Sequence, residues 1–541
     1  VFRMLIFAYQ EIEIYDTTLR EGSQAEGISF SVNDKLKIIS ILDDMQIDYI
    51  EAGWPGANPK DVELFEILKT LPLKHSTIAA FGCTRKPNTL PQEDKILNGL
   101  LEADTKVITI FGKTWDFHVE HALNTTLEEN LNMISDSIKY LKSKGKRVFF
   151  DAEHFFDGYK NNPEYAVKAI ETAYKSGAER IIFCDTNGGC INTEIYKISH
   201  EMCKKFPDAK FGIHTHNDSD MAVANAIAAM SAGVFQIQGT FNGYGERCGN
   251  ANLCSVIPTI QLKMGIDIIG DNIKKLTHTA KKISEIANKN LYEHTPYVGR
   301  SSFSHKAGIH ASGVRKFSST YEHVPPEAIG NTRKILVSDQ SGLATLREKI
   351  KNLKLGTIVR DEDLPKIIEE IKKRESDGMS FEDADASFEI MLTEVLGTRP
   401  KYFELMGFRV ITDTFHDAMS DINSEASIKL KVGDEIFHTV SEGSGPVNAL
   451  DYAVRKALLP LYPEIKNFRL KDFKVRIIDG KDGTAAKTRV HIESTNGYSV
   501  WDTVGVSVNI VEAAYISLTE SITFGLLMQD VPSRHKQTAN V

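Results

Sequence analysis

The chain has 541 residues, of which 25% are charged and 42% hydrophobic, and its formal net charge is −9. This is the composition of an ordinary soluble globular protein, and at about 100–200 residues per domain the length predicts two to four domains. Acidic and basic residues are mixed along the sequence without a basic block, which argues against binding to nucleic acid.

Cysteines and apolar runs indicate the compartment. The six cysteines form no Cys-x-x-Cys pair and are too few for a disulfide framework, so we expect reduced thiols and a cytoplasmic location. The apolar stretch over residues 1–11 is too short to span a membrane, and we identify no other long apolar run. These features predict a protein that does not bind membranes.

From residue 11 to about 260, short apolar runs alternate with amphipathic helical patterns. Eight runs are typical of strands: 11–19, 48–55, 76–82, 106–112, 147–154, 180–186, 210–217 and 234–243. Several are almost continuously apolar, as parallel strands covered on both faces are. The eight units predict a (β/α)8 TIM barrel. A doubly wound open sheet is the alternative, but its glycine-rich phosphate fingerprint is missing after the first strand.

The rest of the chain has a different pattern. We predict a barrel domain over 1–275, mainly helical linker subdomains over 276–386, and a flexible polar tail over 531–541. Between them, residues 387–530 combine strands such as FRVITDTF and RVHIEST with two helices, which predicts a separate α+β domain.

Polar groups follow several predicted barrel strands, at the end where barrel enzymes carry their active sites. They are Asp16, Arg20, Glu21 and Gln24 after the first strand, Asp151, Glu153 and His154 after the fifth, Asp185, Thr186 and Asn187 after the sixth, His214, His216, Asn217 and Asp218 after the seventh, and Glu246, Arg247 and Asn250 after the eighth. This gathering of ionisable groups predicts a catalytic site there.

The sharpest signal is IHTHND, because side chains two apart on a strand point to the same face. Two imidazoles side by side suit a divalent metal, with Glu21 or Asp16 as the carboxylate that completes the set. The alternative is a pair of loop histidines held by hydrogen bonds. Asn250 could add a neutral oxygen ligand.

Two glycine-rich segments are less specific. GYGERCGNAN could hold a phosphate or only turn tightly, and EGSGPV, ahead of a predicted helix, could hold a carboxylate or serve as a flexible loop. Cys184 and Cys190 lie in no thiolate-activating motif and are interpreted as structural.

The motifs DTTLREGSQ, EAGWPGANPKD, DTNGG, IHTHND, NGYGERCGNANL and HKAGIHASG occur in this order. The chain thereby resembles the family of 2-isopropylmalate, homocitrate and citramalate synthases, within the DRE-TIM metallolyase superfamily. EGSGPVNALDYAV and DTVGVSVNIVEAAYISL resemble the allosteric dimerisation domain of that family. The resemblance covers nearly the whole chain.

The resemblance implies an acyltransferase that condenses acetyl-CoA with a 2-oxo acid and then hydrolyses the thioester. It implies metal ligation by Glu21, where the family has Asp or Glu, by His214 and His216, and with Asn250 as a further or supporting ligand. The metal would be Mg or Mn, with Zn as an alternative. Arg20 would stabilise the developing alkoxide.

The remaining implied roles depend on the same resemblance. Thr186 would bind the substrate carboxylate, Gln24 would support the site, and Glu153 would act near acetyl-CoA. His310 matches a linker histidine that in the family reaches the partner subunit's active site, and Tyr321 accompanies it. We expect His310 and Glu153 together to remove the methyl proton. Ser312 stands two residues after this histidine, where some relatives have an acid, so we expect His310 to be tuned differently here.

The resemblance further implies pyruvate as the 2-oxo acid, in isoleucine biosynthesis, a homodimer, and isoleucine as feedback effector. The effector would act near Gly443, Gly445, Pro446 and Val447. Trp54, Phe81, Phe111 and Trp115 could narrow the pocket to suit pyruvate, or could be ordinary packing aromatics. The alternatives are a 2-isopropylmalate synthase acting on 2-oxoisovalerate in leucine biosynthesis, and a catalytically inactive amino-acid sensor.

Overall fold

The structure is a computed structural model that describes residues 12–55, 58–306, 308–335, 346–347, 349–350, 353, 359–381, 384–413, 423–478, 483 and 485–533. The chain divides into two compact units. The barrel unit comprises residues 1–303 and 323–333, and the C-terminal unit comprises 304–322 and 334–541. This division is coarser than the four-part organisation predicted above, whose boundaries stay a prediction.

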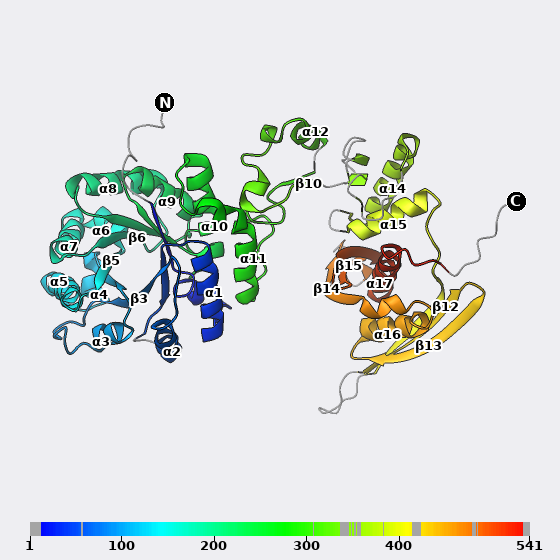
Figure 1. Cartoon of the computed structure of the whole chain (residues 1–541), viewed down its shortest axis with the longest axis horizontal. Coiled ribbons are helices and arrows are strands. Elements are labelled where there is room, and N and C mark those ends of the chain that lie inside the picture. The colour runs from blue at the N-terminus through cyan, green and yellow to red at the C-terminus, as the bar shows by residue number, and fades with distance from the viewer. Residues whose placement is uncertain are drawn as a thin grey trace. The chain divides into compact units, whose positions relative to one another are not determined.

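Eight parallel strands close the barrel in sequence order, so the predicted TIM barrel is confirmed (Figure 1). They are β1 Glu13–Asp16, β2 Tyr49–Gly53, β3 Thr77–Cys83, β4 Val107–Lys113, β5 Arg147–Glu153, β6 Arg180–Asp185, β7 Phe211–Thr215 and β8 Gln236–Gly239. β1 pairs with both β2 and β8, which closes the sheet and places the first and last strands side by side.

Helices surround the strands. They are α1 Val32–Asp44, α2 Pro59–Leu68, α3 Lys95–Glu102, α4 Asp116–His121, α5 Leu127–Ser143, α6 Phe155–Asn161, α7 Pro163–Ser176, α8 Asn192–Lys205, α9 Ala222–Ser231, α10 Leu253–Pro258 and α11 Leu276–Ile286. Their ends follow from local sequence: Asn162 caps α7, Pro163 occupies its first turn, and Gly177 ends it with φ +92°.

Aromatic rings fill the barrel interior below the strand ends. Tyr15, Tyr49 and Phe149 pack together, with ring centroids 5.3–6.2 Å apart. At the N-terminal end of the strands, Arg180 is buried and forms an ion pair with Glu13. The interior is thus a packed core, and in barrels of this kind active sites lie at the opposite, C-terminal end of the strands.

The C-terminal unit contains linker elements, among which β9 and β10 pair as a short parallel sheet, and two three-stranded sheets. The linker elements are β9 Ser304–His305, α12 Gly308–Lys316, β10 Lys334–Ile335, α14 Leu364–Ser376 and α15 Asp385–Val395. The sheets comprise β11 Glu404–Asp413, β12 Asn423–Val432 and β13 Glu435–Gly443, followed by α16 Pro446–Leu458, and β14 Arg469–Ile477, β15 Thr488–Thr495 and β16 Val500–Ser507, followed by α17 Ile510–Leu527. The predicted α+β domain is therefore confirmed.

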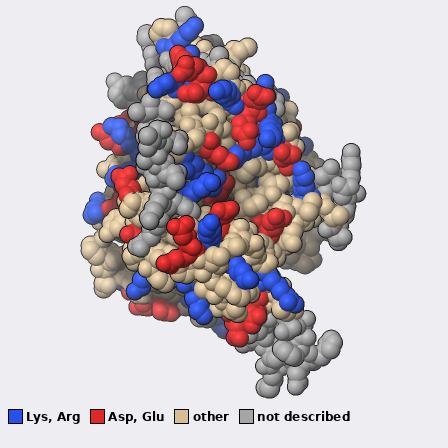
Figure 2. Space-filling model, turned by 90° about the vertical axis from the view of Figure 1, so that its right-hand side faces the viewer, with Lys and Arg blue, Asp and Glu red and all other residues tan. Residues whose placement is uncertain are grey.

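Each three-stranded sheet is antiparallel and carries one helix: α16 packs on β12 and β13, and α17 packs on β15 and β16. α15 contacts α17, where Ser387 donates a hydrogen bond to the buried Glu520 carboxyl. Burial raises the pKa of Glu520 to about 7. On the face drawn in Figure 2, Lys and Arg are interspersed with Asp and Glu, as the mixed charge pattern of the sequence predicts.

α17 corrects one expectation, that no further long apolar run occurs. By length and composition alone it could cross a membrane, but 67% of it is buried inside the structure. Its partners include β15, β16, α15 and α16. This burial is typical of the core helix of a soluble domain.

Candidate active site

Three buried ligand groups meet at the C-terminal end of the barrel strands: Glu21, His214 and His216. His214 lies within β7, His216 directly follows it, and Glu21 precedes the 3-10 turn η1 (Gly22–Gln24) after β1. The two Nε2 atoms are 3.3 Å apart, and His216 Nε2 is 3.7 Å from Glu21 Oε1. One potential ligand atom from each residue lies within 4.8 Å of the others.

The electrostatics of the three residues suit a cation. Burial lowers the pKa of His214, and burial together with His214 lowers the pKa of His216 to about 3. Burial alone would raise the pKa of Glu21, but Arg20 and the two histidines hold it below its ordinary value. At neutral pH the group therefore offers two neutral imidazoles and one carboxylate, the protonation states that metal binding requires.

Asn250 joins this group through an irregular pairing of its backbone with that of His216. Its Nδ2 is 3.1 Å from His214 Nε2, and its Oδ1 is buried without a hydrogen-bond partner among the described residues. A Cβ atom at Gly245, where φ is +153°, would collide with the Asn250 amide. The GYGERCGNAN segment is therefore a tight turn whose glycine lets Asn250 approach the histidines.

This donor set fits a divalent metal. Two imidazole nitrogens and a carboxylate form a facial arrangement that leaves coordination positions open for water or substrate. The unsatisfied Asn250 Oδ1 is a further oxygen donor that an opposite orientation of the amide would turn toward the histidines. Asp16, the other candidate carboxylate, is instead engaged by Thr18, which donates from its backbone N at 3.0 Å and its Oγ1 at 2.7 Å. Burial raises the pKa of Asp16 to about 7.

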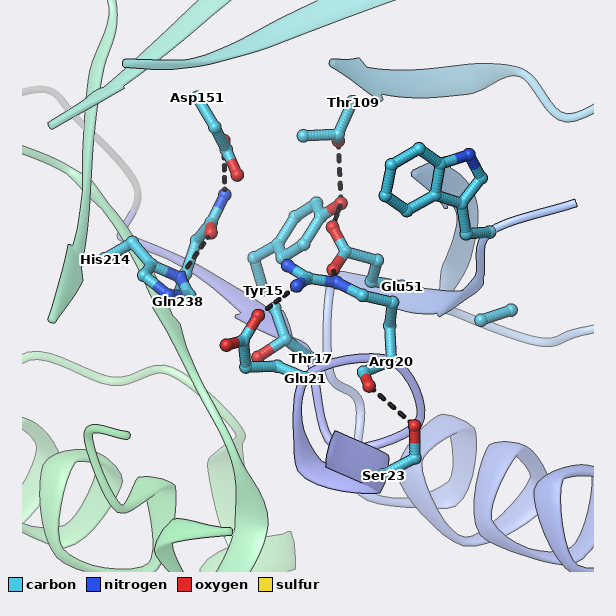
Figure 3. A network of polar contacts seen from close by, with 12 residues as sticks. Tyr15, Thr17, Arg20, Glu21, Ser23, Glu51, Thr109, Asp151, His214 and Gln238 are labelled. Atoms are coloured by element: carbon cyan, nitrogen blue, oxygen red, sulfur yellow. Dashed lines mark hydrogen bonds and ion pairs between the residues drawn. The ribbon is translucent and has the colours of Figure 1, made fainter. Parts of the chain in front are cut away.

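Arg20 lies beside the ligand group and is held by two carboxylates (Figure 3). Its Nε donates to Glu51 Oε1 at 2.6 Å, and its Nη1 contacts Glu21 Oε2. The Phe81 ring lies against the guanidinium, 3.7 Å from Cζ to the ring centroid. Burial alone would lower the pKa of Arg20, but Glu21 and Glu51 raise it, so the positive charge is fixed at the barrel mouth.

Glu51 is the main site residue that the sequence analysis missed. It is fully buried in β2, where it accepts hydrogen bonds from Arg20 and from the Tyr15 hydroxyl, the latter at 2.7 Å. Thr109 lies 2.7 Å from the same hydroxyl. The pairing of β2 with β3 shifts between Glu51 and Gly53, a bulge that changes the side-chain alternation there. The run DYIEAGWP begins with Asp48, and a second acid, Glu51, inside its apolar part was the available signal.

An aromatic wall stands next to Arg20. Trp54, Phe81 and Phe111 pack with ring centroids 5.6–5.9 Å apart. The Trp54 backbone N donates to Asp61, which fixes the start of the loop after β2. Trp54 Nε1 is buried without a hydrogen-bond partner among the described residues. Trp115, the fourth aromatic residue predicted for the pocket, stacks on His118 and contacts His154 instead.

The structure places other predicted residues around the ligand group. Thr186, after β6, accepts a hydrogen bond from the His154 backbone N at 2.9 Å, and its carbonyl accepts one from Arg247 at 2.7 Å. Glu153 ends β5 and forms an ion pair with Lys113. Gln24 ends η1 with an exposed side chain, outside the buried cluster.

His310 and Tyr321 belong to the C-terminal unit, so each is described apart from the barrel. His310 is exposed on α12, and its ring stacks on Tyr321 with centroids 4.1 Å apart. The structure thus brings the two together, and their approach to the barrel site stays a prediction.

The predicted regulatory residues lie at one junction in the same unit. Gly443 ends β13, and Gly445 and Pro446 begin α16, with Val447 in its first turn. The Ser444 backbone N donates to Asn448 Oδ1 at 3.1 Å.

Comparison with known proteins gives a consistent assignment. Residues 11–287 match the HMGL-like family, 297–378 the homocitrate synthase post-HMGL domain-like family, and 382–526 the LeuA allosteric (dimerisation) domain. An (R)-citramalate synthase of Aquifex aeolicus is 50% identical over 96% of this chain and 99% of its own length. That of Geobacter sulfurreducens is 49% identical over 95% and 97%. A 2-isopropylmalate synthase of Methanocaldococcus jannaschii is 30% identical over 94% of each chain.

Glu51→Ala should destabilise the barrel unit. The change removes the buried acceptor of Arg20 Nε and of the Tyr15 hydroxyl, and breaking a buried ion pair from one side costs about 3–5 kcal/mol, although Glu21 and Thr109 remain beside these groups. Native-state hydrogen exchange of the β1 and β2 amides measures this loss apart from the C-terminal unit. Glu66→Ala, which removes an exposed partner of Lys69, should change protection by less than about 0.5 kcal/mol. Equal protection in both variants would contradict the structural role of Glu51.

Proposed function

Since the chain belongs to the (R)-citramalate synthase family, we propose that it condenses acetyl-CoA with pyruvate to give (R)-citramalate and CoA. The methyl carbon of acetyl-CoA loses a proton and bonds to the keto carbon of pyruvate. The keto oxygen takes up the electron pair as an alkoxide and is then protonated, and water cleaves the thioester. The observation that carries the proposal is the buried Glu21, His214 and His216 group beside a fixed Arg20 charge. The product would serve isoleucine biosynthesis.

The site residues divide this work. Glu21, His214 and His216, with Asn250 as a further oxygen donor, would hold a divalent cation such as Mg²⁺ or Mn²⁺, or alternatively Zn²⁺. When bound, such a cation supplies Lewis-acid polarisation to a carbonyl. Arg20 stabilises the alkoxide, and a preorganised charge of this kind contributes a factor of roughly 10²–10³ in rate.

The remaining polar residues bind the substrates. Thr186, held by the His154 backbone, binds the carboxylate of pyruvate, and Gln24 supports the mouth of the site. Glu153 and His310 take the methyl proton of acetyl-CoA, with Tyr321 stacked on the His310 ring to fix its plane. We propose a homodimer, which the match to a dimerisation domain supports, with His310 acting in the partner subunit's site.

Two alternatives remain distinguishable. A 2-isopropylmalate synthase would take 2-oxoisovalerate, and a relative of that name is 30% identical, compared with 50% for the (R)-citramalate synthase of Aquifex aeolicus. The aromatic wall of Trp54, Phe81 and Phe111 favours the smaller pyruvate. A catalytically inactive sensor would not need to keep Arg20 and the metal-ligand group together.

A panel of 2-oxo acids tests the reaction. With acetyl-CoA and Mg²⁺ or Mn²⁺, we expect thiol release to be fastest with pyruvate and to be lost when the metal is chelated. A higher kcat/KM for 2-oxoisovalerate than for pyruvate would replace the proposal with its alternative.

Glu21→Ala should abolish turnover because the carboxylate ligand is lost, while the circular dichroism spectrum stays that of the native protein. Unchanged turnover in this variant would contradict the metal assignment.

Phe111→Ala should relax the substrate preference. Removing a ring from the wall opens space for a longer side chain, and one methylene is worth about 1–3 kcal/mol, or roughly 10–200-fold. We expect the ratio of kcat/KM for 2-oxobutyrate to that for pyruvate to rise within this range. Phe117→Ala, at a ring that is 52% exposed, is the control and should leave the ratio unchanged. The same ratio in both variants would show that the wall does not set specificity.

We further propose that isoleucine inhibits the enzyme by binding near Gly443, Gly445, Pro446 and Val447. The match of residues 382–526 to an allosteric domain supports this position. The backbone amides of the first turn of α16 lack a side-chain cap from Gly445 and can meet a carboxylate.

Two glycine variants test this site. A Cβ atom at Gly443 would lie 2.6 Å from Ala449 N and from Asn448 Oδ1, so Gly443→Ala displaces the start of α16. A Cβ atom at Gly445 meets no atom within 4 Å. We expect Gly443→Ala to raise the half-inhibitory isoleucine concentration by about fivefold or more, and Gly445→Ala to change it less. Full isoleucine sensitivity in Gly443→Ala would place the effector elsewhere.

A further inference from the structure

A chain of buried amide and carboxyl groups continues from the metal-ligand group into the barrel. Gln238, on β8, is 1% exposed. Its Oε1 lies 2.9 Å from His214 Nδ1, and its Nε2 donates to Asp151 Oδ1 at 3.2 Å. Figure 3 shows this line of contacts, from Asp151 through Gln238 to His214. Residues on three strands, β5, β8 and β7, are therefore linked in one line of contacts that ends at the His214 imidazole.

The contacts determine which way the Gln238 amide points. Burial and the charge of Glu51 raise the pKa of Asp151 well above its ordinary value, but a carboxyl oxygen can accept a hydrogen bond in either protonation state, and the structure places the NH2 end of the amide against Asp151 Oδ1. The carbonyl end then faces His214 Nδ1, and a carbonyl can only accept. His214 must therefore carry its proton on Nδ1, which leaves the lone pair of Nε2 free.

The free nitrogen lies where a metal ligand is needed. His214 Nε2 is 3.3 Å from His216 Nε2, within the group that includes Glu21. In the opposite tautomer, Nε2 would carry a proton directed into this group and could not bind a cation. The hydrogen bond at His214 Nδ1 thus determines whether His214 Nε2 can bind a cation.

We propose that Gln238 is a positioning residue that fixes His214 as the Nδ1-protonated tautomer for metal binding, with Asp151 fixing the Gln238 amide. This inference rests on the metal assignment proposed above. Outer hydrogen-bond partners of metal-binding histidines typically change metal affinity by about 10–100-fold when they are removed. Neither residue touches the substrate in this assignment. Removing Gln238 should therefore change the tautomer of His214 and the affinity of the metal-free protein for its cation.

The same strand supplies a matched control. Gln236 is also fully buried and lies two residues before Gln238, so it points to the same face of β8. Its Nε2 donates to Glu13 at 2.9 Å, at the opposite end of the barrel. Gln236→Met removes a buried amide of the same size without touching the metal-ligand group.

The first measurement is the tautomer of His214 in the metal-free full-length protein, read by NMR of ¹⁵N-labelled histidine. We expect a protonated Nδ1 in the native protein and in Gln236→Met. Gln238→Met should give a mixture of tautomers, because a thioether is a weak acceptor. Gln238→Glu, which keeps an oxygen acceptor, should restore the native tautomer. A single native tautomer in Gln238→Met would overturn the proposal.

The second measurement is the affinity for Mn²⁺, read from the free-ion signal in electron paramagnetic resonance. We expect Gln238→Met to bind about 10–100-fold more weakly than the native protein, and Gln236→Met to bind equally well. If Gln238→Met does not fold, Asp151→Leu serves instead, because it removes the acceptor of the Gln238 amide whatever the protonation state of Asp151, so that the amide can turn and the tautomers should mix. Native affinity and a native tautomer in a folded Asp151→Leu would also overturn the proposal.

These outcomes separate the two levels of inference. If the native protein binds no Mn²⁺, or if His214→Ala binds it as well as the native protein does, the metal assignment fails. If the native protein binds Mn²⁺ and His214→Ala does not, the assignment stands. The role of Gln238 then depends only on whether Gln238→Met changes the tautomer and the affinity.

Discussion

A guanidinium that is buried away from water needs carboxylate partners to balance its charge, and Arg20, at the mouth of this barrel, has two. Glu51 holds it from inside the barrel, and Glu21 contacts it from the metal-ligand group. Removing either acid leaves the guanidinium with one carboxylate and with a buried donor that has lost its acceptor, which is unfavourable in a protein interior. The pair of ion contacts therefore fixes the position of the positive charge and also connects it to the proposed cation site.

The barrel makes this arrangement possible because its strands bring distant segments together. Glu21 follows β1, His214 lies in β7 and Asn250 follows β8, yet β1 and β8 are direct neighbours in the sheet. Local irregularities then adjust single residues. The bulge in β2 sets Glu51, and the close approach of Gly245 lets Asn250 reach the histidines. A regular scaffold with a few defined irregularities thus accounts for most of the site.

Much of this was predictable from the sequence, for physical reasons. Buried parallel strands are almost continuously apolar, so the eight barrel strands could be located, and the period of two in IHTHND placed His214 and His216 on one face. Glu51 was missed because it lies inside a mostly apolar run, and Gln238 was missed because a neutral amide, even with Gln236 two residues before it, carries no signal of metal binding or catalysis by itself. Their partners, Arg20 and Asp151, come from other strands and are recognised only when the barrel closes.

Two buried carboxyl groups have a consequence for the energetics of unfolding. Burial raises the pKa of Asp16 in the barrel unit, and of Glu520 in the C-terminal unit, to about 7. Between the ordinary carboxyl pKa and this value, each folded unit binds a proton that its unfolded chain releases, so stability falls as pH rises through that interval. Heat unfolding near pH 6 must then deliver protons to the buffer. The calorimetric enthalpy measured in phosphate should therefore differ from that in a buffer with a large ionisation heat.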